Sequence, residues 1–127
     1  MPPADSPAEL RPSPIAGRGL FLTAPVASGA IVDGVDGARL NHSCDPSLGW
    51  TPAGGLRARA DLDAGTELTI DYATSIDDPD FVMNCHCETY RCRQIIEGTD
   101  WQIPQLQLRY TGQFAPALRR RLEDASR

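Results

Sequence analysis

Four cysteines are the residues of this chain whose types and spacing point most directly to chemistry. Cys85, Cys87 and Cys92 form a CxCx4C cluster, and Cys44 lies far upstream in the run NHSCDP. Structural zinc sites are closed by four cysteine or histidine ligands in a tetrahedron, so one distant thiol would complete the site that the late cluster begins. The sequence therefore predicts one zinc ion bound by all four cysteines, joining two remote stretches of the chain.

Two disulfides, or four unrelated thiols, are the alternative interpretation of these cysteines. A disulfide framework belongs to secreted proteins, and the first residues of the chain show no basic and then apolar signal segment. Because a reducing compartment favours metal binding by such spacing, zinc and a cytoplasmic location are the expectation. A residue between two chelating cysteines usually points away from the ion, so we leave His86 outside the ligand set.

Four motifs carry a resemblance to a known family. The run NHSCDP at 41–46 resembles the NHSCxPN signature of SET-domain protein methyltransferases, and GTELTIDY at 65–72 resembles their GEELTxDY strand. GRG at 17–19 resembles the GxG motif that opens the domain, and the segment from Cys85 to Cys92 resembles the post-SET zinc knuckle. Because all four occur in the family's order, the chain resembles the SET-domain protein-lysine methyltransferases. The tail from Asp100 onward resembles the extension that follows the zinc knuckle in small bacterial SET proteins.

The resemblance implies a fold and a division of the chain. We expect a mainly β structure with C-terminal helices (α+β), in the SET-type β-clip fold of small antiparallel sheets with a threaded pseudoknot, an exception to the rule against knotted connections. The segment Asn41–His42 should then lie beside the strand that ends at Tyr72. The expected parts are a SET domain at 9–83 with a very short insert, a post-SET knuckle at 84–98 and a helical extension at 99–127.

The resemblance also implies site residues. Tyr72 would be catalytic, its phenol oxygen orienting the lysine amine and the transferring methyl group. The residues implied to bind S-adenosylmethionine are Gly17, Arg18, Gly19, Asn41, His42, Tyr72 and Trp101. From the residues alone, structural interpretations stay open for each of them. Residues 17–19 could form a tight turn, and Asn41 and His42 could cap the local backbone. Tyr72 could be a buried tyrosine at a strand end, and Trp101 could be a core anchor.

Two departures from the family pattern bear on activity. Between Gly29 and Asn41 the family has a YxG motif and an insert that forms one wall of the peptide groove, whereas this chain has a short segment with Val32 in place of the tyrosine. Ser47 stands where the signature usually ends in asparagine. Two functions therefore fit the sequence: a protein-lysine N-methyltransferase, and a zinc-stabilised SET-like module that binds cofactor or a partner without methyl transfer. A second copy of the chain could also cover the peptide groove that the short insert leaves open, so a homodimer is a further expectation.

Composition and charge exclude several other classes of function. The chain of 127 residues suits one domain, and its net charge of −5 argues against nonspecific nucleic-acid binding while suiting a basic protein or peptide partner. No apolar run is long enough to span a bilayer, so no membrane partner is expected. The chain contains no lysine, which excludes methylation of its own lysine side chains.

Periodicity and turn residues predict the elements that must position these groups. Strands are expected at 8–11, 19–23, 56–60 and 67–71, the last with Leu68 and Ile70 on one face, and a hairpin tip at 53–55. Pro104 and Pro116 suit first helical turns, and apolar pairs at i, i+4 spacing should pack these two helices onto the domain. Trp50 is expected in the core.

Overall fold

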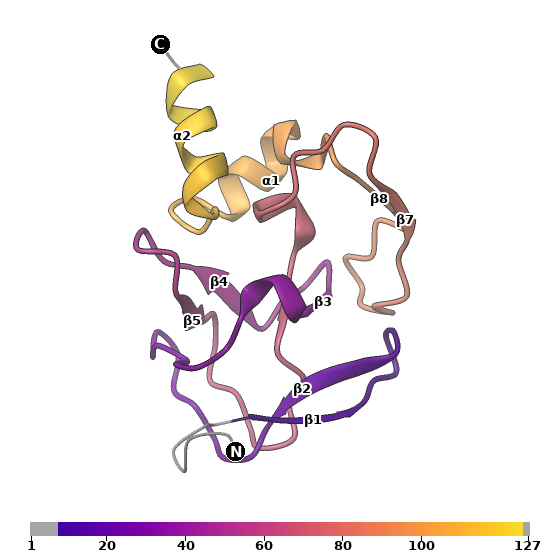
Figure 1. Cartoon of the computed structure of the whole chain (residues 1–127), viewed down its shortest axis with the longest axis vertical. Helices are drawn as coiled ribbons and strands as arrows, with labels where there is room; N and C mark the ends of the chain where they lie inside the picture. The colour runs from indigo at the N-terminus through magenta and orange to yellow at the C-terminus, as the bar shows by residue number, and fades with distance from the viewer. Residues whose placement is uncertain (1–7, 126–127) are drawn as a thin grey trace.

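The computed structural model describes residues 8–125, so the amino-terminal residues 1–7 that bear on a signal segment lie outside the described part. The fold is mainly β, with small two-stranded sheets followed by C-terminal helices (Figure 1), as the sequence predicts. The strands are β1 (Ala8–Pro12), β2 (Arg18–Leu22), β3 (Asn41–His42), β4 (Leu48–Trp50), β5 (Leu56–Ala58), β6 (Thr69–Ile70), β7 (Val82–Asn84) and β8 (Ile95–Glu97). The helical elements are the 3-10 turns η1 (Gly37–Arg39), η2 (Tyr72–Thr74) and η3 (Asp100–Gln102), and the α-helices α1 (Pro104–Arg109) and α2 (Pro116–Ala125).

Two antiparallel hairpins follow the sequence expectations closely. β1 pairs with β2, and β4 pairs with β5 around the predicted tip at 53–55. Along β5, Leu56 and Ala58 are buried while Arg57 is exposed, which confirms the alternation expected of a half-solvated strand. Leu22, Leu48 and Leu56 from these hairpins are at most 2% exposed and belong to one apolar cluster of nine buried residues, called the β core below.

The central strand pair differs from the expectation. β6 is shorter than predicted and pairs in parallel with β3, so Asn41 lies opposite Thr69 and His42 opposite Ile70. Leu68, Thr69 and Ile70 are all buried, because both faces of this pair are covered by other elements. Burial therefore extends to both faces of β6 and is not limited to the face that carries Leu68 and Ile70. The expected adjacency of the Asn41–His42 segment and the strand before Tyr72 is confirmed. The threaded connection stays a prediction.

The short segment at 30–40 folds onto the β core. The Val32 amide donates to the Leu56 carbonyl over 2.9 Å, and the Val32 side chain is buried. At the start of η1, the backbone of Gly37 packs directly against the Trp50 ring, because a Cβ atom on Gly37 would come within 2.4 Å of the indole Cη2. This segment therefore brings its backbone against Trp50.

The C-terminal helices form a second apolar cluster. α1 and α2 begin at Pro104 and Pro116, as predicted. Leu106, Tyr110 and Leu118 are buried together with Trp101, Ala73 and Phe114 in what we call the C-terminal core. The Ala115 amide donates to the Thr74 carbonyl over 2.8 Å, so the connection into α2 is joined directly to η2.

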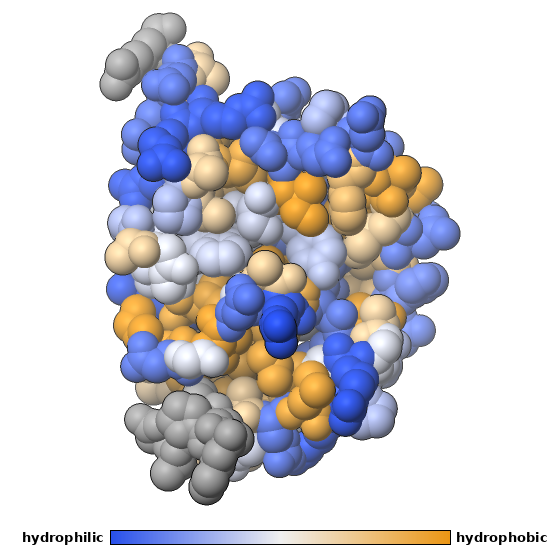
Figure 2. All heavy atoms as spheres, viewed as in Figure 1, coloured by the Kyte–Doolittle hydropathy of each residue, from blue (hydrophilic) through white to orange (hydrophobic). Residues whose placement is uncertain are grey.

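Residues 84–98, called the knuckle below, run from the end of β7 through β8 and lie on one side of the molecule (Figure 1). Between Phe81 and Thr99, all of them described, only Ile96 and Gly98 are buried. On the face in Figure 2, polar and charged side chains cover α2, while apolar side chains reach the surface over the β-rich part. Among the described residues no helix is long and apolar enough to cross a membrane.

Candidate functional site

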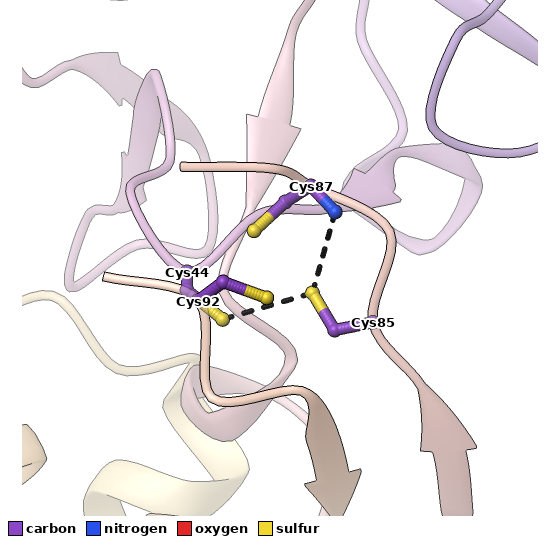
Figure 3. Close-up of side chains that lie close together, drawn as sticks. All are labelled: Cys44, Cys85, Cys87 and Cys92. Carbon is purple, nitrogen blue, oxygen red and sulfur yellow. Dashed lines mark hydrogen bonds between the residues drawn. The ribbon is translucent and has the colours of Figure 1, made fainter. Parts of the chain in front are cut away.

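The four cysteines converge as the sequence predicts. Their Sγ atoms all lie within 4.8 Å of one another, and Figure 3 shows the sulfurs pointing toward a common centre. Cys44 comes from the loop after β3, Cys85 follows β7, and Cys87 and Cys92 lie in the loop before β8. All four are free thiols, so the disulfide alternative is not realised, and His86 is exposed to solvent.

The geometry and charge of this cluster suit a zinc ion. Sulfurs in a tetrahedral site with Zn–S bonds of about 2.3 Å are about 3.8 Å apart, and Cys44 Sγ lies 3.8 Å from Cys85 Sγ. Burial raises the pKa of the Cys44 thiol to about 11. A divalent cation would offset this cost by stabilising the thiolate directly. The four cysteines could therefore hold a metal ion of the kind predicted.

His42 links the cysteine cluster to Tyr72. Its Nδ1 accepts a hydrogen bond from the Tyr72 amide over 2.9 Å, and its Nε2 lies 3.2 Å from Cys44 Sγ. A backbone amide only donates, so Nδ1 carries no proton and Nε2–H donates to the sulfur. Burial lowers the pKa of His42 to about 4, which agrees with a neutral ring. The imidazole thus joins a predicted metal ligand to the backbone of the predicted catalytic residue.

Tyr72 begins η2 rather than ending a strand. Its hydroxyl donates to the Leu40 carbonyl over 2.8 Å, and its ring makes an edge contact with His42 at 5.1 Å between centroids. The side chain is half-buried, and burial raises the pKa of its phenol above the ordinary value. Tyr72 therefore keeps its proton at neutral pH and holds its hydroxyl at a fixed place against the backbone.

A hollow of about 370 Å³ opens beside Tyr72. Its lining consists of Gly37, Ala38, Trp50, Ile70, Tyr72, Ser75 and Ile76. Trp50 is only partly buried, and its indole Nε1–H donates to Thr74 Oγ1 over 3.1 Å. The sequence predicted that Trp50 lies in the core, and its side chain does pack against the β core. Trp50 also lines the hollow, and no local motif in the sequence indicated this hollow.

Gly17 and Gly19 have different reasons to be glycine. Gly17 has a φ of +47°, a left-handed conformation that side chains disfavour, and its carbonyl accepts from the Ser13 amide. A Cβ atom on Gly19 would come within 2.3 Å of Glu67 Oε2. The loop is therefore both a tight turn and a close backbone approach.

Asn41 ties this loop to β3. Its side-chain amide donates to the carbonyls of Ala16 and Arg18 over 3.1 and 3.3 Å, and to Glu67 Oε2 over 2.8 Å. Three oxygens thus converge on one nitrogen at the edge of β3. The same kind of oxygen cluster would suit the ammonium group of an amino acid ligand. Arg18 itself has an exposed side chain.

Trp101 lies in the C-terminal core. It is 6% exposed, and the Arg121 guanidinium lies over its ring at 4.6 Å from the centroid. In the structure the indole is a core anchor, one of the two roles that the sequence left open. Its contact with an adenine ring stays a prediction.

Comparisons with known proteins give a partial match. No family model matches the chain. The chain is 33% identical over 89 residues to Histone-lysine N-methyltransferase ash1 of Drosophila melanogaster, a match that covers 61% of this chain. The matched part is 4% of the length of that relative. The similarity supports the resemblance to SET-domain methyltransferases and, at that level, a methyltransferase-like function.

Proposed function

We propose that this protein is an S-adenosylmethionine-dependent protein-lysine N-methyltransferase stabilised by zinc, acting on a basic protein or peptide. The observation that carries the proposal is the adjacency of β3 and η2, which brings Asn41, His42 and Tyr72 together beside the four-cysteine cluster. The partial similarity to a histone-lysine N-methyltransferase supports the same reaction class.

The residues around β3 suit the cofactor. The oxygens of Ala16, Arg18 and Glu67 that now surround the Asn41 amide could receive the ammonium of its amino acid part. Gly17 and Gly19 leave the neighbouring backbone without side chains. Bound S-adenosylmethionine would supply an activated methyl group on a sulfonium cation. The chain's part is to fix the position of this group relative to the acceptor amine.

The residues around Tyr72 suit the acceptor. The hollow between Trp50 and Tyr72 is largely apolar, so it could take the aliphatic stem of a lysine side chain. An amine in such a place, beside a positive sulfonium, loses its proton more easily because desolvation and like charge both lower its pKa. The Tyr72 hydroxyl, held on the Leu40 carbonyl, would align the neutral amine with the methyl group.

A second candidate function rests on two observations. Val32 stands in place of the family's second tyrosine and is 4% exposed inside the β core, so it cannot contact a substrate. The Tyr72 hydroxyl already has a backbone partner. A module that binds cofactor or a protein partner without methyl transfer is the alternative that these features favour.

Methyl transfer to basic proteins separates the two functions. We expect zinc-loaded protein to add methyl groups from S-adenosylmethionine to lysines of core histones or other basic proteins, detected by mass spectrometry of the substrate. Because this chain contains no lysine, a methyl-lysine signal comes from the substrate alone. Tyr72→Phe should lower turnover by roughly ten-fold or more, about 1.4 kcal/mol.

The exposed tyrosine Tyr90, 82% accessible, gives the matched control. Tyr90→Phe removes the same hydroxyl from the surface and should leave turnover unchanged. Cofactor binding by the unmodified protein without transfer to any basic protein would favour the binding module instead. Full turnover in Tyr72→Phe would remove Tyr72 from its assigned role.

A further inference from the structure

The buried carboxylate of Asp71, directly before Tyr72, collects hydrogen bonds from three parts of the chain. Asp71 is 1% exposed. Arg93 binds it with both terminal nitrogens, over 2.7 Å to Oδ2 and 3.0 Å to Oδ1. The Tyr110 hydroxyl donates to Oδ2 over 2.8 Å, and the Ala73 amide donates to Oδ1 over 2.9 Å. One side chain therefore connects the knuckle, the end of α1 and η2.

Arg93 is itself fixed from two sides. It follows Cys92, the last knuckle cysteine, and its backbone amide lies 3.3 Å from Cys44 Sγ as a donor. Its Nη2 also donates to Asp100 Oδ2 over 3.1 Å. The paired guanidinium geometry is one that arginine can form and lysine cannot. Because Arg93 contacts both Cys44 and Asp71, a shift of the cysteine cluster should also shift the Asp71 carboxylate.

Asp71 in turn sets the start of η2. Its carboxylate caps the turn at Ala73, and its carbonyl accepts from Thr74 Oγ1 over 2.6 Å. Burial alone would raise the pKa of Asp71, but the Arg93 guanidinium outweighs burial and holds this pKa below its ordinary value. The carboxylate therefore stays ionised and keeps all its donors. Tyr72, the first residue of η2, takes its backbone orientation from this cap and from His42.

We propose that Asp71, Arg93 and Tyr110 are positioning residues that set the orientation of the Tyr72 ring. The alignment of the reacting groups then depends on the cysteine cluster and on the end of α1. This inference rests on the proposed methyl transfer for its kinetic consequence, but the ring orientation itself does not depend on activity. A displacement of about 1 Å at a reacting group can lower a rate by roughly a hundred-fold, so a small change in the cap should be visible in kcat.

Arg93→Lys tests the paired contact. The variant keeps the positive charge and loses the two-point grip on Asp71. With zinc content unchanged, we expect kcat to fall roughly ten-fold or more while KM and cofactor affinity by calorimetry change by less than about two-fold. Arg120→Lys, on the exposed face of α2, is the matched control and should leave kcat unchanged.

A second readout follows the ring directly. The chain has three tyrosines, so protein labelled with 3-fluorotyrosine should give three fluorine resonances, assigned with single Tyr→Phe variants. Arg93→Lys should shift or broaden the Tyr72 resonance and leave that of exposed Tyr90 in place. Tyr110→Phe, which deletes one donor to Asp71 and keeps the ring in the core, should move the same resonance and serves if Arg93→Lys does not fold.

The outcomes separate this inference from the proposed function. A displaced Tyr72 resonance together with a fall in kcat supports both. A displaced resonance in a protein that shows no methyl transfer supports the positioning network and contradicts the proposed reaction. An unchanged Tyr72 resonance in folded, zinc-loaded Arg93→Lys or Tyr110→Phe overturns the network, whatever the activity. A lower melting temperature with unchanged kcat would reduce the three residues to a purely structural role.

Discussion

The β core and the knuckle are held in place by different forces. The β core buries nine apolar residues from strands and connections between Leu22 and Ile70. Within the described stretch from Phe81 to Thr99, Ile96 is the one large apolar side chain that is buried. The cysteine cluster and Arg93 join the knuckle to Cys44 and Asp71, in addition to the pairing of β8 with β7. The fixed conformation of the knuckle should therefore depend on metal and charge, whereas that of the β core depends on apolar burial.

Tyr72 depends on both the β core and the knuckle for its position. Tyr72 lies where the two regions meet: its ring packs against the β core, while its backbone follows His42 and Asp71. Through these residues it is connected to Cys44 and Arg93. A site built at such a boundary can lose its geometry without loss of the core.

Removing one cysteine should have the largest effect. Cys44→Ser deletes the ligand that connects the cluster to β3, and we expect loss of bound zinc and a decrease of at least about 4 kcal/mol in the free energy of unfolding. Elemental analysis and chemical denaturation measure the two effects. His86→Ala changes an exposed residue of the same loop and should keep stoichiometric zinc. Normal metal content in Cys44→Ser would contradict the four-cysteine site.

Truncation in the β core should have the next largest effect, and it should not depend on metal. Leu48 is 1% exposed, so Leu48→Ala should lower the free energy of unfolding by about 2–5 kcal/mol. The loss should be similar in zinc-loaded and chelator-treated protein, measured by denaturation in each state. Leu108→Ala, at a side chain 79% exposed, is the control with little expected change. A loss seen only with zinc present would mean that the two regions fold as one unit.

A smaller effect is expected at the wall of the hollow. Gly37→Ala places a methyl group against the Trp50 ring, and we expect a cost of about 1–3 kcal/mol with a change in tryptophan fluorescence. Gly55→Ala, where the nearest atom is Thr51 Oγ1 at 3.4 Å, is the matched control. Unchanged fluorescence and stability in Gly37→Ala would show that Trp50 moves freely and does not form a wall.

The smallest expected effect on stability is at Tyr72. Tyr72→Phe leaves the Leu40 carbonyl without its hydroxyl donor, which should cost about 1 kcal/mol of folding free energy. Denaturation of the variant in parallel with wild type gives this value. A much larger cost would mean that the hydroxyl is mainly a structural group, and would weaken its assignment to amine alignment.

Short-range signals in the sequence predicted the elements better than the contacts between them. The cysteine spacing predicted the convergence of the four thiols, and Pro104 and Pro116 predicted where both helices begin. The burial of Thr69 on a parallel pair could not be predicted, because periodicity does not show what covers the second face of a strand.

The polar network at Asp71 was missed for a related reason. Asp71 lies inside the motif GTELTIDY, but nothing in the motif indicates which residues bind its carboxylate, and Tyr110 belongs to none of the four motifs. Arg93 gave one weak signal, its place directly after the last knuckle cysteine. Contacts between residues far apart in the chain depend on the packed structure and leave no spacing pattern, so the connection between the cysteine cluster and Tyr72 became visible only in three dimensions.

Hydrogen exchange measured by mass spectrometry, on zinc-loaded and chelator-treated protein, tests the central claim most directly. Removal of the metal should increase exchange in the knuckle and in the segments 41–44 and 71–75, while β2, β4 and β5 keep their protection. That result would show that the cysteine cluster, and not the β core, orders the residues around Tyr72. Equal loss of protection throughout the chain, or unchanged exchange around Tyr72 after the zinc is removed, would contradict the account.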